Sequence, residues 1–386
     1  MDEFSNPYRP GAGTTPPALL GRDELIRQIT MTTRRAKAGR PGKSVMAVGL
    51  RGVGKTVLLN RFSEVAAEED YDVAFIEATD NGNFATVLAV RLRKILLELD
   101  RGSVSRHVAR ALRVLKSFTL QLPDGSTIQL DPEPLIGEAD SGRLDDDLTD
   151  LLVAVGEAAR DRSRGVLVAV DEVQYLSEDE LSALIVAVHR TTQLNLPLVV
   201  VGAGLPQLPG LAGEARSYSE RLFEFPEIGS LGDADARAAL EIPARDAGAA
   251  YTGDALDELV RASHGYPYFL QEWGYHVWNH AIGSPVPVDD VHAVRPLVLG
   301  ALDRDFFRVR LDRLTPKERE YLRAMAELGP GPHRSGDVAG KLGVRVESVG
   351  PRRGGLIRKG MIYSPAHGDT AFTVPLFDEF LRRTLP

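Results

Sequence analysis

The residues whose chemistry is clearest form a glycine-rich segment with the spacing Gly-x4-Gly-Lys-Thr. Glycines let backbone N–H groups curl around phosphates, and a helix that begins there adds the positive end of its dipole. Lys55 is expected to reach the β- and γ-phosphates, and Thr56 to supply a hydroxyl to Mg²⁺. The segment therefore predicts a nucleoside triphosphate site. Its residues are Gly49, Leu50, Arg51, Gly52, Val53, Gly54, Lys55, Thr56 and Val57.

Two carboxylates, Asp171 and Glu172, follow the apolar run Gly165–Val170 further along the chain. Open α/β sheets bind their ligands at the carboxyl ends of the strands. Asp171 is expected to hold the Mg²⁺ shell, and Glu172 to orient or deprotonate the water that attacks the γ-phosphate. The alternative is an ordinary helix cap, but the position after a buried strand favours the nucleotide site.

These residues need a scaffold of strands and helices to bring them together. Ser44–Val48 and Gly165–Val170 predict buried strands, Val57–Phe62 begins a helical pattern, and Leu196–Gly202 predicts a further strand. Strand, loop and helix in this order indicate an α/β fold with a parallel sheet.

Composition narrows the class of protein. The chain has 386 residues, 43% of them hydrophobic and 26% charged, as expected for a folded protein of two or three domains. It has no cysteine, which excludes disulfides, thiol nucleophiles and cysteine-ligated metals. Met1–Gly13 has no apolar signal region, and no run approaches the roughly 18 residues of a membrane span. We expect a cytoplasmic protein without a membrane partner.

Charge is distributed unevenly along the chain. The net charge is −8, yet residues 314–386 carry twelve Lys/Arg and eight Asp/Glu, a net of +4 that leaves −12 on the rest. Composition alone does not say whether the basic part meets DNA, a partner or only water.

Several motifs resemble those of the AAA+ ATPases, in their origin-recognition-like and STAND-type branch. Asn6–Gly11 and Leu20–Leu25 are similar to segments that precede the glycine-rich loop in that family, and Asp171–Gln174 is similar to its Asp-Glu-x-Gln motif. The resemblance implies ATP rather than GTP. It also implies that Leu20, Gly21 and Arg22 line the adenine pocket.

The resemblance further implies residues that complete an active site. Family members place a polar sensor side chain at the end of the strand that here reads Gly202-Ala-Gly204, so Gln207 is a substitute candidate, or hydrolysis is slow. Arg216 and Arg221 lie where relatives carry an arginine that contacts the γ-phosphate of a neighbouring subunit. Ordinary solvated charges are the equal alternative.

A helical lid is expected after the sheet domain. His264–Leu270 resembles the Gly-x-Pro signature of STAND-type lids, in which Pro267 would start a helix over the nucleotide. Pro267–Trp278 contains no basic residue except His276, so the usual sensor arginine is absent. This absence favours a slow switch over a fast motor.

Three other features have simpler interpretations. Phe118–Leu122 and Ser126–Leu130 flank Asp124-Gly125 and predict an inserted hairpin at about 116–131, either an interaction arm or a cover for a sheet edge. Asp145–Asp147 is expected to favour a helix N-terminus. His276 and His280 have zinc-protease spacing but lack its glutamate, so no metal site is expected there.

The C-terminal pattern resembles a winged-helix domain. Three helical segments, Thr315–Ala326, Ser335–Leu342 and Val346–Lys359, precede a hairpin around His367. The third segment would enter the major groove of double-stranded DNA, although Pro351, Gly354 and Gly355 are expected to kink or loosen it. Packing on the ATPase or binding protein is the alternative. The candidate DNA contacts are Arg345, Arg352, Arg353, Arg358 and Lys359.

We therefore predict a nucleotide-binding core at 1–226, a helical lid at 227–313 and a winged helix at 314–386. The leading hypothesis is a slow ATPase that acts as a switch: nucleotide in the cleft between core and lid sets the winged helix, which binds DNA or a partner. Two alternatives stay open. One is a non-catalytic ATP-dependent scaffold or sensor, and the other is a transposition or replication-loader ATPase that self-associates on DNA.

Overall fold

A computed structural model describes residues 1–11, 13–79, 83–101, 105–122, 133–366 and 368–385. The chain forms two compact units. The sheet unit contains Asp23–Val48 and Lys55–Glu227, and the C-terminal unit contains Met1–Arg22, Gly49–Gly54 and Ile228–Pro386. The glycine-rich loop, Gly49–Gly54, therefore belongs to a different unit from the strand before it and the helix after it.

A five-stranded parallel sheet forms the centre of the sheet unit. Its order is β2-β3-β4-β1-β5. Val170 of β3 lies beside Gly202 of β4, and Gly204 lies beside Val48 of β1, so the carboxyl ends of these strands share one edge. This confirms the predicted α/β fold. The strands are β1 (Ser44–Val48), β2 (Tyr71–Glu77), β3 (Gly165–Asp171), β4 (Leu198–Gly204) and β5 (Phe223–Glu224).

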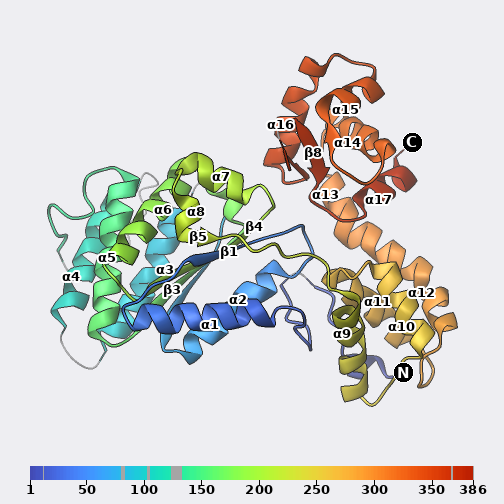
Figure 1. The fold of residues 1–386 in the computed structure, drawn as a ribbon, viewed down its shortest axis with the longest axis horizontal. Helices are drawn as coiled ribbons and strands as arrows, with labels where there is room; N and C mark the ends of the chain where they lie inside the picture. Colours follow the sequence, from blue (N-terminus) through green and yellow to red (C-terminus); the bar gives the residue numbers. More distant parts are fainter. Residues whose placement is uncertain (12, 80–82, 102–104, 123–132, 367, 386) are drawn as a thin grey trace. The chain divides into compact units, whose positions relative to one another are not determined.

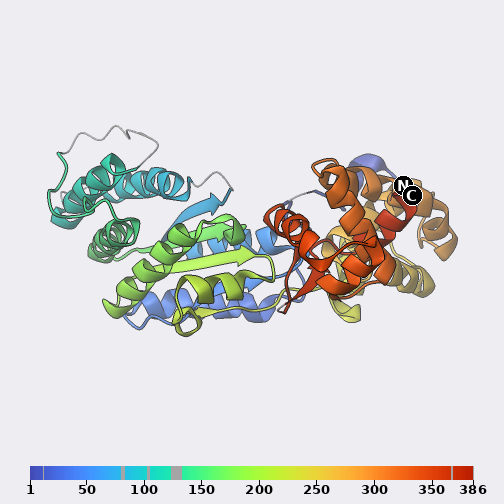
Figure 2. The same cartoon turned by 90° about the horizontal axis from the view of Figure 1, so that it is seen from above.

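Alternation along the strands divides the core between two helical layers, which Figures 1 and 2 show on either side of the sheet. Val166, Val168 and Val170 point into the cluster formed by the helices from α3 to α6. On the other face α2 packs against β2, β3 and β4, and α1 packs on α2. The helices are α1 (Asp23–Lys37), α2 (Lys55–Glu68), α3 (Phe84–Leu99), α4 (Arg106–Leu120), α5 (Leu144–Asp161), α6 (Glu178–Gln193), α7 (Leu208–Ala215) and α8 (Ser219–Leu222).

The predicted strand Phe118–Leu122 is wrong over its first three residues, which belong to α4. Val108, Leu115 and Phe118 recur at helical spacing and are buried, whereas Leu120 is 52% exposed, so burial does not alternate as in a strand. Gln121 and Leu122 follow the helix without forming a strand, and the remainder of the predicted hairpin, including Asp124-Gly125, lies outside the described residues.

Four helices begin the C-terminal unit, and α12 continues without a break through a π-helical stretch, Leu302–Arg308, into α13. This continuous helical stretch begins at Val288. Pro267 opens α11 at a first-turn position, as predicted. The helices are α9 (Asp233–Asp246), α10 (Gly253–Ser263), α11 (Pro267–His280), α12 (Val288–Ala301) and α13 (Val309–Leu311).

The remaining chain adds a small antiparallel sheet, β6-β8-β7, among four helices. The expectation that Pro351 kinks the third helix is wrong, because Pro351 occupies the first turn of α16, where no intrahelical N–H bond is lost. The elements are α14 (Pro316–Leu328), β6 (His333–Arg334), α15 (Ser335–Leu342), α16 (Gly350–Arg358), β7 (Ile362–Tyr363), β8 (Asp369–Phe372) and α17 (Phe377–Thr384).

One continuous hydrophobic core joins both parts of the C-terminal unit. Phe307, which follows α12, stacks on Phe380 of α17 with ring centroids 5.0 Å apart. The N-terminal segment completes this core: Tyr8 is 2% exposed, packs over Gly274, and donates its hydroxyl to the Leu240 carbonyl at 2.6 Å. Among the described residues, no helix is long and apolar enough to span a membrane.

Candidate functional site

The loop Gly49–Gly54 joins the end of β1 to the start of α2. Gly52 and Gly54 have φ values of +83° and +89°, which residues with a Cβ avoid. At Gly49 a Cβ would lie 2.2 Å from the Ile228 carbonyl oxygen, so a side chain is excluded there as well. The three glycines of the motif are thus explained by backbone geometry, and α2 begins at Lys55, as phosphate binding at a helix N-terminus requires.

Thr56 and Asp171 are brought into direct contact. The Thr56 hydroxyl donates to Asp171 Oδ2 at 2.6 Å, and the backbone N–H of Glu172 donates to Asp171 Oδ1 at 2.9 Å. Burial raises the pKa of Asp171, which is 4% exposed, while the hydrogen bond from Thr56 acts in the opposite direction. The two residues that the sequence predicted as magnesium ligands therefore lie together.

This donor set fits Mg²⁺, which prefers hard oxygen ligands and is often held by one or two protein groups together with phosphates and water. A hydroxyl and a buried carboxylate at the start of a helix supply such groups. Within the described ranges there is no cluster of three or more His, Asp or Glu side chains that would form an all-protein metal cage.

Glu172 adopts an unusual backbone conformation at the end of β3. Its φ of +53° and ψ of +40° place it in the left-handed region, which costs roughly 1–2 kcal/mol for a residue with a Cβ. Its carboxylate Oε2 accepts a hydrogen bond from Gln174 Nε2. Strain of this kind at a strand end is typical of a functional position.

The end of β4 is glycine for reasons of space. A Cβ on Gly202 would lie 2.4 Å from Met46 Sδ and 2.9 Å from Val173 Cγ2, and a Cβ on Gly204 would lie 2.9 Å from Gln174 Oε1. Gln174 Oε1 accepts from the Leu205 N–H at 3.0 Å. Sequence reasoning quoted Gln174 within a motif but gave it no role. The one signal in the sequence that could have pointed to Gln174 is that β4 ends at Gly204 without a polar side chain.

The other predicted sensor and arginine residues are spread over α7 and α8. Gln207 precedes α7, and its Oε1 is buried without a hydrogen-bond partner among the described residues. Arg216, at the C-terminal end of α7, lies 3.2 Å from Asp145 in an ion pair, so it is engaged within its own unit. Arg221 of α8 is exposed.

Asp145–Asp147 lies in the first turn of α5, and Asp147 accepts the N–H groups of Ser141 and Gly142. His276 pairs with Glu272 at 3.3 Å, whereas His280 lies 4.0 Å from Asp290. The two histidines thus have different partners.

Within the C-terminal unit, Arg22 joins the glycine-rich loop to the segment before α9. Its Nη2 donates to the Gly229 carbonyl at 2.8 Å and, more weakly, to the Val53 carbonyl at 3.4 Å. Burial lowers the pKa of Arg22, although Asp235 opposes this effect. Gly21 lies against Asp235, and Leu20 packs on the core. An adenine-binding role for these residues stays a prediction.

The same loop is hydrogen-bonded to α11 and to the residues that flank β7 and β8. The Tyr268 N–H, one residue after Pro267, donates to the Gly52 carbonyl at 3.2 Å. The Arg51 N–H donates to the Thr373 carbonyl at 2.9 Å, and Arg51 Nε lies 3.4 Å from the Gly360 carbonyl oxygen. Sequence reasoning missed Thr373 and Gly360, because neither belongs to a motif.

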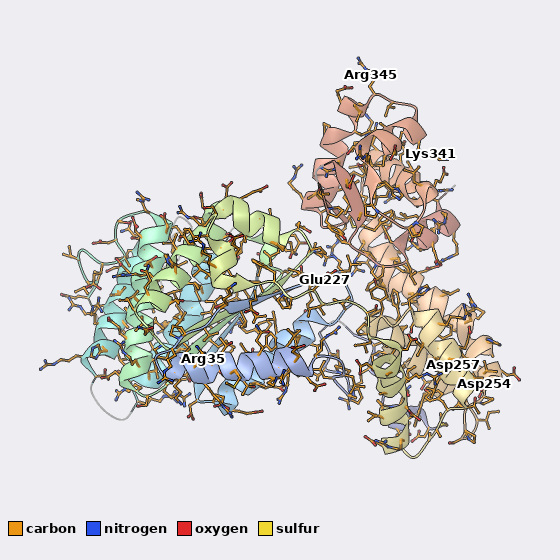
Figure 3. All side chains as sticks on the ribbon, viewed as in Figure 1. Arg35, Glu227, Asp254, Asp257, Lys341 and Arg345 are labelled. Atoms are coloured by element: carbon orange, nitrogen blue, oxygen red, sulfur yellow. The ribbon has the colours of Figure 1, made fainter. Side chains whose placement is uncertain are left out.

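The candidate DNA contacts divide into two groups. Arg353 donates to Thr370 and Ser364, Lys359 bonds Glu318 at 2.7 Å, and Arg352 lies 3.6 Å from Glu320. These three hold the small domain together. Arg345 and Arg358 are exposed, and Figure 3 shows Arg345 directed away from the ribbon. His367 lies outside the described residues.

Family comparison matches residues 18–201 to the AAA ATPase domain, and residues 304–381 to a domain of unknown function, DUF8462. The first match contains both Gly49–Thr56 and Asp171-Glu172. The match supports an ATP-binding AAA ATPase domain at 18–201, in line with the resemblance. No curated protein sequence matches the chain.

Solved structures support the fold. A Walker-type ATPase of Pyrococcus abyssi is 16% identical, with a TM-score of 0.54 over 97% of this chain and 98% of that one. Cdc6p of Pyrobaculum aerophilum is 14% identical with a TM-score of 0.45, covering 100% of this chain and 99% of that one. The RuvB branch migration motor of Thermotoga maritima is 15% identical with a TM-score of 0.46, covering 95% and 96%. Only the first similarity is strong enough to carry the argument on fold.

The burial of Asp171 predicts a pH-dependent stability. Because its pKa is raised in the folded state, ionised Asp171 destabilises the nucleotide-free protein at neutral pH, and this penalty fades as pH falls through the raised pKa. We expect Asp171→Asn to raise the melting temperature at pH 7.5 by a few degrees, with a smaller gain at pH 5. Thermal unfolding monitored by circular dichroism measures both. If Asp171→Asn raises the melting temperature less at pH 7.5 than at pH 5, each compared with wild type, the result contradicts a raised pKa for Asp171.

Proposed function

We propose that this protein is an ATP-dependent switch, in which ATP at Gly49–Thr56 is hydrolysed slowly and the nucleotide state controls residues 314–386. The observation that carries the proposal is the hydrogen bond from the Arg51 N–H to the Thr373 carbonyl. The proposal adopts three functional parts: the nucleotide-binding core at 1–226, the lid at 227–313 and a winged helix at 314–386.

The proposed chemistry assigns one task to each residue. Lys55 contacts the β- and γ-phosphates, Thr56 and Asp171 hold Mg²⁺, and Glu172 orients or deprotonates the attacking water. Mg²⁺, when bound, neutralises charge on the phosphate oxygens. The 2.6 Å contact between Thr56 and Asp171 supports the shared metal role.

Arg221 is the better candidate for an arginine that acts on a neighbouring copy, since it is exposed while Arg216 is paired with Asp145. A guanidinium supplied in this way would stabilise transition-state charge. The proposal thus includes self-association in the active form.

The proposed switch follows because the backbone of the loop Gly49–Gly54 would bind phosphate and is also hydrogen-bonded to other segments. Phosphate binding requires the loop's backbone N–H groups to take a particular arrangement. The Arg51 N–H and the Gly52 carbonyl already have partners in Thr373 and Tyr268. A change in loop conformation when ATP binds or is hydrolysed would therefore reach α11 and the segments at Gly360 and Thr373 through single hydrogen bonds.

For residues 314–386 we propose a winged helix that binds double-stranded DNA. The order α14, β6, α15, α16, β7, β8 supports the fold, and β7 pairs with β8 as a hairpin. Exposed Arg345 and Arg358 support phosphate contact. The contacts of Arg352, Arg353 and Lys359 within the domain make these three the weaker candidates, and a protein partner is the second possibility.

Replacing Lys55 tests hydrolysis. We expect Lys55→Ala to lower turnover by about 100-fold or more, because one charge donor to the transferred phosphoryl group is lost. Phosphate release measures turnover. Lys43→Ala is the matched control, since the Lys43 ammonium donates to the Glu220 carbonyl on an exposed surface. If wild type binds ATP but turns over no faster than Lys55→Ala, the protein is a non-catalytic sensor.

Charge reversal tests DNA binding. We expect wild type to bind duplex DNA with an affinity that falls as the salt concentration rises. The double variant Arg345→Glu and Arg358→Glu should bind more weakly, on the order of tenfold or more, and its affinity should depend less on salt. Fluorescence anisotropy measures both quantities. Arg40→Glu, an exposed arginine of the sheet unit, is the control. Absent or salt-independent affinity would rule out a phosphate-binding surface and favour a protein partner.

A further inference from the structure

We infer that Gln174 is a positioning residue for Glu172, and that it occupies the place where a polar side chain on β4 was expected. The inference rests on the proposed function, in which Glu172 orients or deprotonates the attacking water. Its basis is a chain of two hydrogen bonds, from Leu205 N–H to Gln174 and from Gln174 to Glu172.

The chemistry of the partners fixes the orientation of the Gln174 amide. A carboxylate only accepts hydrogen bonds and a backbone N–H only donates. The amide nitrogen must therefore face Glu172 Oε2, and the amide oxygen must face the Leu205 N–H. No other common uncharged side chain of this length offers a donor and an acceptor on one planar group, so the residue type is specified by its two neighbours.

The glycines at the end of β4 make room for this amide. Gly204 lies beside Val48 of β1, and a Cβ there would come within 2.9 Å of Gln174 Oε1. At Gly202 a Cβ would meet Met46 and Val173. A larger residue at either position would displace the stretch Val173–Tyr175 or the Gln174 side chain. The missing polar residue on β4 and the presence of Gln174 are thus two parts of one arrangement.

The bridge also accounts for the backbone of Glu172. Its left-handed conformation turns the chain directly after β3, so that Gln174 comes back beside the end of β4. Gln174 then ties the Glu172 carboxylate to β4, the strand that lies between β3 and β1. A carboxylate held in this way loses less rotational freedom when it engages a water molecule.

Two substitutions separate positioning from general stability. We expect Gln174→Leu to lower kcat about tenfold to a hundredfold with ATP affinity unchanged, because the Glu172 carboxylate loses its orientation. Gln174→Glu keeps an acceptor for the Leu205 N–H but sets a second carboxylate beside Glu172, so it should lower kcat as well. Gln28→Leu is the matched control, since it removes an exposed hydrogen bond from an amide to a carboxylate, that of Glu224, outside the proposed site.

A second measurement needs neither ATP nor turnover. In nucleotide-free protein, Gln174→Leu should speed hydrogen exchange at the Leu205 amide, since its acceptor is removed, whereas Gln174→Glu keeps a carboxylate oxygen there and should preserve protection.

The outcomes distinguish this inference from the proposed function. Wild-type turnover no faster than that of Lys55→Ala would overturn the proposed hydrolysis and the role of Gln174 with it. Measurable wild-type turnover that both Gln174 variants leave unchanged or raise would overturn the inference alone. Unchanged exchange at Leu205 in Gln174→Leu would do the same.

Discussion

The hydrogen bond between Thr56 and Asp171 is the interaction on which the proposed metal-binding edge of the sheet depends. It joins the first turn of α2, which follows β1 in the chain, to the end of β3, and β4 lies between these two strands in the sheet. Asp171 can be buried at this edge because Thr56 and the Glu172 N–H both donate to it. Helices on both faces of the sheet hold these strand ends in place, so the carboxylate and the start of α2 share a fixed geometry.

The glycine-rich loop links this chemistry to the rest of the chain through its backbone. Arg51 and Gly52 use main-chain groups to contact Thr373 and Tyr268, and Val53 accepts from Arg22. Contacts of this kind depend on conformation rather than on side-chain identity. A loop whose side chains are largely those of a glycine-rich motif can therefore still contact α11 and the segment after β8.

The sequence predicted most of the fold because the decisive signals are local. Buried apolar runs placed β1 and β3, capping residues placed α14, and Pro267 placed the start of α11. Phe118–Leu120 was assigned wrongly, since alternating residues fit both a strand and the last turn of an amphipathic helix. The sequence could not predict the contacts of Gln174, Thr373 and Gly360, because these contacts join segments far apart in the chain. Thr373 and Gly360 also act through backbone atoms, which carry no sequence signal.

The most direct test of the switch is hydrogen exchange of the whole protein with and without a non-hydrolysable ATP analogue and Mg²⁺. The account predicts that the analogue changes the exchange of amides in 360–374 and at the start of α11, as well as in Gly49–Thr56, and that Lys55→Ala abolishes these changes. Protection confined to the glycine-rich loop and α2, with exchange in 360–374 unaltered at saturating analogue, would contradict it.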